Sequence, residues 1–487
     1  MFLGPQPGCW DAYATAMACA QAQVIEHVAK AAQCYSGASP RHLEARFAAV
    51  DPCPEEGEAL DHVLRWVGRY VLADSVAVNH TMTMAHLHCA PLVPALAAEV
   101  LISASNASMD SWDQAPAASH LEQRIVEWLT GHFGLPPDAD GIFTSGGTQS
   151  NFLGLLLARD RFCQHEFGVS VQRSGLPAQA SRLRVLCSSV AHFSVQQSAA
   201  ILGLGHDAVV PVRVDAAQRM DSDQLRIAVT QLRAQGLLPM AVVATAGTTD
   251  FGSIDPLPAA ADLCEREGLW LHVDAAYGGA LAFSERLRPL LDGIGRADSL
   301  TVDFHKLFWQ PISASALLLR DRSAWELLRL HADYLNPIAG QAQGALDLVT
   351  KSIQTTRRFD SLKLFVTLRT LGRRRFAALV EQTVDLAAAV AACIDADPAF
   401  ERAAPVTINS VVFRCVNPEW DADQTDRVNA QVRERLLMEG RALIGRTRVN
   451  GRTYLKFTLL NPHAGMAEIE QLLRELQSRA RHCGAAP

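Results

Sequence analysis

One lysine and one aspartate, each at the end of its own apolar stretch, are the residues whose types and spacing first suggest chemistry. Lys306 follows His305 in SLTVDFHKLFWQP, and Asp274 ends the apolar run in WLHVDAAYGGA. A lysine alone in such a setting could be a surface residue or a helix cap. Together, an amine that forms an imine with an aldehyde and an acid that keeps a pyridine nitrogen protonated are what a pyridoxal phosphate site requires. We therefore expect Lys306 and Asp274 to flank one cofactor ring.

The stretch TSGGTQSN (residues 144–151) has the composition of an anion-binding turn. Its glycines let backbone amides approach an anion, and the helix that it opens adds a favourable dipole. A plain tight turn with a Ser/Thr cap is the alternative. No Lys-Ser/Thr pair follows, which argues against a Walker loop. The run Gly203-Leu-Gly205-His-Asp-Ala208 follows a helix and precedes a strand, so we interpret it as a helix C-cap and predict no NAD site.

Histidines and threonines in three further segments are candidates for the same site. His192, in SSVAHFSVQQSA, could cover a cofactor ring and handle protons, although a capping or core histidine is the alternative. Thr249, in ATAGTTDFGSID, could hydrogen-bond a ring substituent. His80, His86 and His88 in NHTMTMAHLH lack the spacing of a helical ligand pair, so we predict no metal site there.

The elements that must position these residues alternate along the middle of the chain. Strands are expected at 182–187, 209–214, 240–246, 269–273, 300–302 and 314–319, and helices at 193–202, 222–234, 257–267 and 285–291. Continuously apolar strands separated by helices predict an α/β fold with a mostly parallel sheet covered on both faces. Ligands of such sheets bind beyond the carboxyl ends of the strands, where Asp274 and Lys306 lie. A helix at 119–133 is predicted to begin at a capping box formed by Ser119 and Glu122.

Three regions of the chain differ in pattern. Residues 1–90 predict helices at 11–32 and 58–72 that are too few to bury both faces, so we expect this N-terminal lobe to lie on another subunit. Residues 91–372 contain the sheet. Residues 373–487 predict a smaller C-terminal α/β domain with strands at 411–416 and 454–460 and helices at 424–439 and 466–478. Further helices are expected at 359–371 and 376–393.

The amino-acid composition argues against some classes of binding protein and favours a reducing compartment. The 487 residues are 49% hydrophobic, and 44 basic residues face 51 acidic ones, giving a net charge of −7. This balance argues against a nucleic-acid or membrane-surface binder. Eleven cysteines without a Cys-x-x-Cys pair favour free thiols in a reducing compartment. The first residues lack the features of a signal peptide, and we expect a cytoplasmic location.

Taken together, HVDAAYGGA, DFHKLFWQP, SGGTQSN, AHFS and ATAGTTDFGSIDP resemble the group II pyridoxal-phosphate decarboxylases, the family of aromatic amino acid, glutamate and diaminobutyrate decarboxylases. The blocks occur in the family's order and cover most of the chain. The resemblance implies the aspartate aminotransferase fold (fold type I) and pyridoxal 5'-phosphate as cofactor. It also implies an obligate homodimer with shared active sites, in which the N-terminal lobe wraps the partner.

The resemblance implies catalytic roles for four residues. Lys306 carries the imine with the cofactor, Asp274 holds the pyridine nitrogen, and His192 stacks on the ring. Tyr334, in HADYLNPIAG, matches the tyrosine of the family's mobile catalytic loop, which protonates the substrate carbon after carbon dioxide leaves. The rest of that mobile segment is expected at 339–348.

The resemblance also implies cofactor and substrate contacts. Thr249 lies near the ring, Gly147, Thr148 and His305 belong to the phosphate end, and His80 lies in the substrate segment. The family often has His-Pro where this chain has His80-Thr81.

A second departure from the family concerns Asp303, where an asparagine is frequent. An acid facing a phosphate is unfavourable, so we expect Asp303 to point away or to bind through water. The AHLH segment and the HK-x-F-x-QP pattern resemble the bacterial diaminobutyrate and lysine decarboxylases of siderophore and diamine pathways.

The expected reaction is α-decarboxylation of an L-amino acid to the amine, with L-2,4-diaminobutyrate or another diamino acid as substrate. Aromatic or acidic amino acids are alternative substrates. An aldehyde-forming oxidative deaminase on the same scaffold is an alternative reaction, against which Tyr334 argues. A cofactor-binding protein without turnover is the non-enzymatic alternative.

Overall fold

The computed structural model describes residues 2–330 and 344–484, and their contacts divide the chain into two compact units. The first unit comprises residues 1–90, 386–403 and 409–487, and the second comprises 91–385 and 404–408. Residues 1–90 therefore share a unit with the C-terminal residues, whereas the sequence-based division gave them a lobe of their own. The cause is a short strand, β1 (Thr83–Met84), that pairs with a C-terminal strand.

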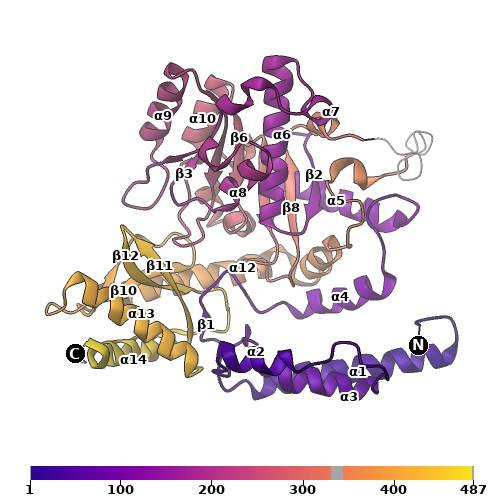
Figure 1. Ribbon diagram of the computed structural model, residues 1–487, viewed down its shortest axis with the longest axis vertical. Coiled ribbons are helices and arrows are strands. Elements are labelled where there is room, and N and C mark those ends of the chain that lie inside the picture. The colour runs from indigo at the N-terminus through magenta and orange to yellow at the C-terminus, as the bar shows by residue number, and fades with distance from the viewer. Residues whose placement is uncertain (1, 331–343, 485–487) are drawn as a thin grey trace. The chain divides into compact units, whose positions relative to one another are not determined.

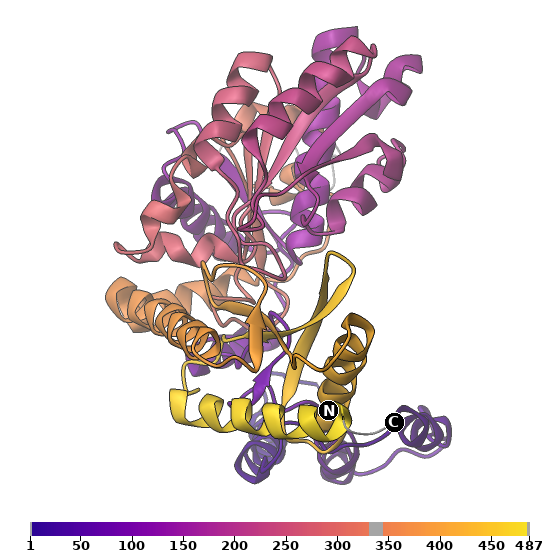
Figure 2. The ribbon, with the colours of Figure 1, turned by 90° about the vertical axis from the view of Figure 1, so that its left-hand side faces the viewer.

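The second unit is built on a seven-stranded sheet (Figures 1 and 2). Its strands are β2 (Asp140–Thr144), β3 (Leu183–Ser188), β4 (Val209–Val212), β5 (Leu238–Thr245), β6 (Trp270–Asp274), β7 (Ser299–Asp303) and β8 (Ser315–Leu319), in the order β2-β8-β7-β6-β5-β3-β4. Neighbours from β4 to β7 pair in parallel, and β8 is antiparallel to both β7 and β2. The predicted strands and the mostly parallel sheet are confirmed. Because both faces of the sheet are covered, all residues of β2, β6, β7 and β8 are buried, including polar ones such as Thr301 and Asp303.

Helices flank this sheet on both sides (Figure 2). The α-helices of this unit up to residue 267 are α4 (Val93–Ser105), α5 (Pro116–His132), α6 (Gly147–Phe167), α7 (Val171–Ser174), α8 (Ser194–Ile201), α9 (Ser222–Ala234) and α10 (Leu257–Glu267). Residues 285–291 do not form the predicted helix, because only a 3-10 turn lies there, at Arg288–Leu291. Among these helices α6 packs against β5, β6, β7 and β8, and its first turn lies at the edge of the sheet where β5, β6 and β7 end and the antiparallel β8 begins.

The predicted capping box of α5 is wrong. The helix begins at Pro116, a residue whose fixed φ suits the first helical turn, so Ser119 lies inside the helix. Glu122 is buried and pairs with Arg357 over 2.8 Å instead of reaching back to the cap.

A long helix, α12 (Ser361–Asp395), is broken by non-helical angles at Gly372, whose φ of 69° is left-handed. The break separates the two helices predicted at 359–371 and 376–393. By length and composition α12 could cross a membrane, as core helices of soluble proteins also could. The ring of Phe376 is fully buried, with its centroid 5.0 Å from that of Phe283 and 5.2 Å from that of Phe308, so this part of α12 is a core helix.

The first unit has a five-stranded sheet with the order β1-β11-β12-β10-β9. The strands β9 (Phe400–Arg402), β10 (Ser410–Cys415), β11 (Leu443–Val449) and β12 (Arg452–Thr458) are antiparallel, and β1 joins β11 in parallel. Its helices are α1 (Pro7–Lys30), α2 (Pro40–Ala48), α3 (Leu60–Val67), α13 (Ala422–Met438) and α14 (Met466–Gly484). The sequence predicted β10, β12 and both C-terminal helices but missed α2, β1, β9 and β11.

Candidate active site

Asp274 and Lys306 line one cavity of about 390 Å³ at the carboxyl ends of the parallel strands. Asp274 is the last residue of β6, and Lys306 follows β7 by three residues. Because β6 and β7 are parallel neighbours, their carboxyl ends lie at the same edge of the sheet. The predicted cofactor residues that line this cavity are Lys306, Asp274, His192, Gly147, Thr148, Thr249 and His305.

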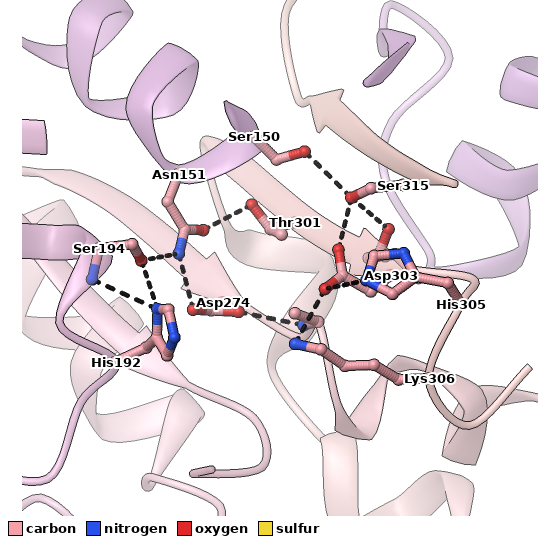
Figure 3. A network of polar contacts seen from close by, with 12 residues as sticks. Ser150, Asn151, His192, Ser194, Asp274, Thr301, Asp303, His305, Lys306 and Ser315 are labelled. Carbon is pink, nitrogen blue, oxygen red and sulfur yellow. Dashed lines mark hydrogen bonds and ion pairs between the residues drawn. The ribbon is translucent and has the colours of Figure 1, made fainter. Parts of the chain in front are cut away.

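The Lys306 ammonium has a carboxylate as its nearest partner. Its Nζ lies 2.9 Å from Oδ2 of Asp303 (Figure 3). Burial by itself would lower the pKa of Lys306, but the charges of Asp303 and Asp274 outweigh it and hold that pKa above its usual value. The chain without cofactor therefore keeps this lysine charged.

Of the two alternatives expected for Asp303, pointing away from the site is wrong, and binding a phosphate through water stays a prediction. Its carboxylate lines the cavity, is 1% exposed, and accepts a hydrogen bond from Ser315 Oγ over 2.6 Å. Gly147 lies so close that an added Cβ would be 2.9 Å from Asp303 Oδ2. Lys306 and Ser315 together satisfy the carboxylate, which explains how an acid is accommodated beside the glycine turn.

Asp274 is held by a residue that the sequence analysis did not single out. Asn151, in the first turns of α6, donates from Nδ2 to Asp274 Oδ2 over 2.8 Å (Figure 3). The backbone N–H of Ala276 donates to the other carboxylate oxygen over 3.1 Å. The available signal was a polar pair, Ser150 and Asn151, at the start of a helix whose following residues are apolar.

His192 lies between β3 and α8 and is half-buried at the cavity. Burial, with the neighbouring Lys306 charge, lowers the pKa of its imidazole despite the opposing charge of Asp274. Its Nδ1 lies 2.8 Å from Ser194 Oγ. A neutral ring at this wall can lie against a planar ligand without adding a charge.

The glycine turn supplies the anion-binding end of the cavity. Gly147 is the first residue of α6, and Ser145, Gly146 and Thr148 line the cavity beside it. The first turn of a helix directs backbone N–H groups away from the helix, and together with the dipole of this 21-residue helix they favour an anion here. His305 donates from Nδ1 to the Ala314 carbonyl over 2.8 Å, which fixes its ring.

Of the other predicted site residues, only His80 can be placed, and it does not line this cavity. Tyr334 and residues 339–343 are outside the described residues. His80 belongs to the first unit, where its Nδ1 accepts from the Met82 N–H over 3.1 Å and burial lowers its pKa. Within residues 2–330 and 344–484, no group of three His, Cys, Asp or Glu side chains could hold a metal ion.

Known proteins with similar sequences show which family this chain belongs to. Residues 42–416 match the family model of the pyridoxal-dependent decarboxylase conserved domain. The chain belongs to the pyridoxal-dependent decarboxylases. It is 43% identical over 458 residues to an L-2,4-diaminobutyrate decarboxylase of Rhizobium meliloti (strain 1021), covering 94% of this chain and 90% of that relative. An L-2,4-diaminobutyrate decarboxylase of Acinetobacter baumannii is 40% identical, with 92% and 88% covered.

A solved structure extends the likeness to the fold. The glutamate decarboxylase domain of diaminobutyrate-pyruvate transaminase and L-2,4-diaminobutyrate decarboxylase from Vibrio parahaemolyticus superimposes with a TM-score of 0.91 at 39% identity, covering 99% of this chain and 98% of that one. The fold is therefore that of the fold type I pyridoxal-dependent decarboxylases. The chain is an enzyme of the amino-acid carboxy-lyase class, and pyridoxal phosphate is the family's cofactor.

The cavity of this decarboxylase suits pyridoxal phosphate. It offers an amine at Lys306, a carboxylate at Asp274 and an anion-binding helix terminus. In addition, Thr245 Oγ1 is buried at the wall and has no hydrogen-bond partner in the described part of the chain. A polar ligand group would satisfy this hydroxyl, as buried polar atoms require.

Proposed function

We propose that this decarboxylase converts L-2,4-diaminobutyrate to the corresponding amine and carbon dioxide, as a cytoplasmic homodimer. Two relatives with that printed activity, 43% and 40% identical over nearly the whole chain, support the choice of substrate. The reaction rests on one observation above all: Lys306 and Asp274 meet at one cavity that also holds the N-terminus of α6.

When bound, pyridoxal phosphate supplies an electron sink for the bond to the departing carboxylate. Lys306 is the amine that would hold the cofactor, and Asp274 would keep the proton on the pyridine nitrogen by its charge. Thr148 and the backbone N–H groups of the α6 turn would bind the phosphate.

The remaining residues have separate tasks. His192 would cover the ring, and Thr249 would hydrogen-bond a ring substituent. Asp303 would receive the Lys306 ammonium each time a substrate amine displaces it, in the pairing that the cavity already contains. Tyr334 would deliver the proton to the substrate carbon after carbon dioxide leaves, and His80 would contact the substrate.

The dimer proposal is supported by the N-terminal helices. None of α1, α2 and α3 buries a residue within its unit. Trp10, Ile25 and Leu60 are 54%, 66% and 57% exposed, which is unusual for side chains of this size. A second copy of the chain would cover them, and light scattering of the purified protein would give the mass that decides this. All eleven cysteines are free, which supports a reducing cytoplasm.

A substrate panel tests the proposed activity. Purified protein loaded with pyridoxal phosphate is offered 2,4-diaminobutyrate, lysine, ornithine, glutamate, aspartate and aromatic amino acids, and released carbon dioxide is measured. The highest kcat/KM is expected for 2,4-diaminobutyrate, and a higher value for another amino acid would overturn the substrate. Amine and hydrogen peroxide from the same incubation separate decarboxylation from oxidative deamination.

Lys306→Ala is the matched control for this panel. It is expected to lose turnover and the yellow colour of the loaded protein while remaining folded. A Lys306→Ala protein that stays yellow after dialysis would contradict the assignment of the lysine.

A further inference from the structure

A chain of buried hydrogen bonds ends on Asp274 from behind the cavity. Trp270 Nε1 donates to Ser299 Oγ over 2.8 Å, and Ser299 Oγ lies 2.7 Å from His272 Nδ1. His272 Nε2 lies 2.9 Å from Asn151 Oδ1, and Asn151 Nδ2 donates to Asp274 over 2.8 Å. Ser299 and His272 are 0% exposed, and Asn151 is 1% exposed. Water therefore does not compete for these contacts.

The two ends of this chain fix its direction. An indole N–H can only donate and an ionised carboxylate can only accept. Asp274 only accepts, so the amide nitrogen of Asn151, and not its oxygen, faces Asp274. The amide oxygen then faces His272 Nε2 and can only accept, so neutral His272 carries its proton on Nε2. Nδ1 of His272 is therefore an acceptor that takes the hydroxyl hydrogen of Ser299, while Ser299 accepts from Trp270.

A branch from the same amide reaches His192 (Figure 3). The second N–H of Asn151 Nδ2 donates to Ser194 Oγ over 3.0 Å. Ser194 Oγ in turn lies 2.8 Å from His192 Nδ1, and the Ser194 backbone N–H lies 3.3 Å from the same nitrogen. Because Nδ1 of His192 accepts these bonds, its proton is on Nε2.

Asn151 has no capacity left for a ligand. Its two N–H groups serve Asp274 and Ser194, and its oxygen accepts from His272 and from Thr301 Oγ1, the latter over 2.8 Å. Although Asn151 lies at the cavity wall, it acts through its neighbours.

We propose that Asn151, oriented by His272 and Ser299, is a positioning residue that holds the Asp274 carboxylate for the cofactor and fixes the proton of His192 on Nε2. The proposal rests on the proposed roles of Asp274 and His192 at the cofactor. Burial keeps the pKa of His272 down at about 4, so at neutral pH it orients the amide without supplying a charge.

The test is the pH dependence of cofactor affinity in Asn151→Asp. At high pH this variant places two carboxylates face to face at the 2.8 Å contact, and the dissociation constant for pyridoxal phosphate is expected to rise by about tenfold or more. As the pH falls, the carboxyl introduced at residue 151 takes up a proton and can again donate to Asp274. The loss of cofactor affinity relative to the wild type should then become smaller. Affinity is read from the visible absorbance of protein titrated with pyridoxal phosphate.

Two controls separate positioning from folding. Thr301→Val removes a buried hydroxyl from the same cluster but leaves the bond to Asp274, so affinity should stay within about twofold of the wild type. Asn151→Leu cannot donate a hydrogen bond to Asp274 at any pH. Its affinity for pyridoxal phosphate should therefore be lower than that of the wild type and should stay lower as the pH falls. The proposal would be overturned if Asn151→Asp bound pyridoxal phosphate as tightly as the wild type does, or if its loss of affinity did not change with pH.

A measurement on the wild type keeps the proposal falsifiable if the variants do not fold. Nitrogen NMR of ¹⁵N-histidine-labelled protein, assigned with His192→Gln and His272→Gln, should show the proton on Nε2 of both rings at neutral pH. A proton on Nδ1 of either ring would contradict the proposed hydrogen-bond network. If the Asn151 proposal fails, the substrate panel and the Lys306→Ala result still stand. Failure of this proposal is therefore distinguishable from failure of the proposed function.

Discussion

The Lys306 ammonium lies 2.9 Å from the Asp303 carboxylate, which also accepts the hydroxyl of Ser315. This pairing stabilises the charged amine, whereas attack on an aldehyde needs the neutral amine. In the proposed function, Asp303 would therefore oppose the covalent capture of the cofactor by Lys306 and would favour the charged, released lysine.

Asp303→Asn is expected to speed cofactor capture at neutral pH. Without the carboxylate the pKa of Lys306 falls, so more of the amine is neutral at neutral pH, and the capture rate should rise by about tenfold. Stopped-flow visible absorbance of the cofactor-free protein mixed with pyridoxal phosphate measures the rate. The pH profile should move to lower pH as a whole, and an unmoved profile would mean that Asp303 does not control the amine.

Asp274→Asn separates catalysis from folding. The amide keeps the size of the side chain but loses the charge that would hold the pyridine proton, so carbon dioxide release is expected to fall by about 100-fold or more. The unfolding free energy of the cofactor-free protein should change by no more than about 1 kcal/mol. Comparable losses in both would indicate that Asp274 is structural.

Gly147→Ala tests the close approach at the phosphate end. Its Cβ would lie 2.9 Å from Asp303 Oδ2 and 3.3 Å from the Ala276 Cβ, so the turn or the carboxylate must shift. Cofactor affinity is expected to fall by about tenfold or more, measured by equilibrium dialysis of pyridoxal phosphate. Gly131→Ala in α5, where an added Cβ meets nothing within 4 Å, is the control and should bind as the wild type does.

His132→Phe tests a source of acid instability. His132 packs with its ring centroid 5.0 Å from that of Trp128 and 4.5 Å from that of Phe283, and burial with the Arg288 charge lowers its pKa from 6.5 to about 4. Between these pH values the unfolded chain takes up a proton that the folded chain resists. Stability is therefore lost as pH falls, by at most about 3 kcal/mol from this group.

Phenylalanine keeps the ring and removes the proton site. The variant should lose less unfolding free energy than the wild type between pH 7 and about pH 4, measured by urea denaturation at each pH. His165→Gln, with the original side chain 84% exposed, should follow the wild type. Parallel curves for all three proteins would show that His132 does not contribute to acid instability.

Most of the large sheet could be predicted because burial on both faces leaves a local trace. The runs at 240–246, 269–273 and 300–302 became β5, β6 and β7, and the strand ends placed Asp274 and Lys306 correctly. The short strands β1 and β9 left no such trace, because two or three residues are too few for a period.

By itself, then, the sequence determined which residues end the central strands, which turn could bind an anion, and which family the chain resembles. Only the tertiary structure decided that Asn151 meets Asp274, 123 residues away, and that Asp303 turns toward Lys306. The reason is physical: a hydrophobic pattern reports whether a side chain is buried, but the partner of a buried polar group depends on the order in which strands and helices pack.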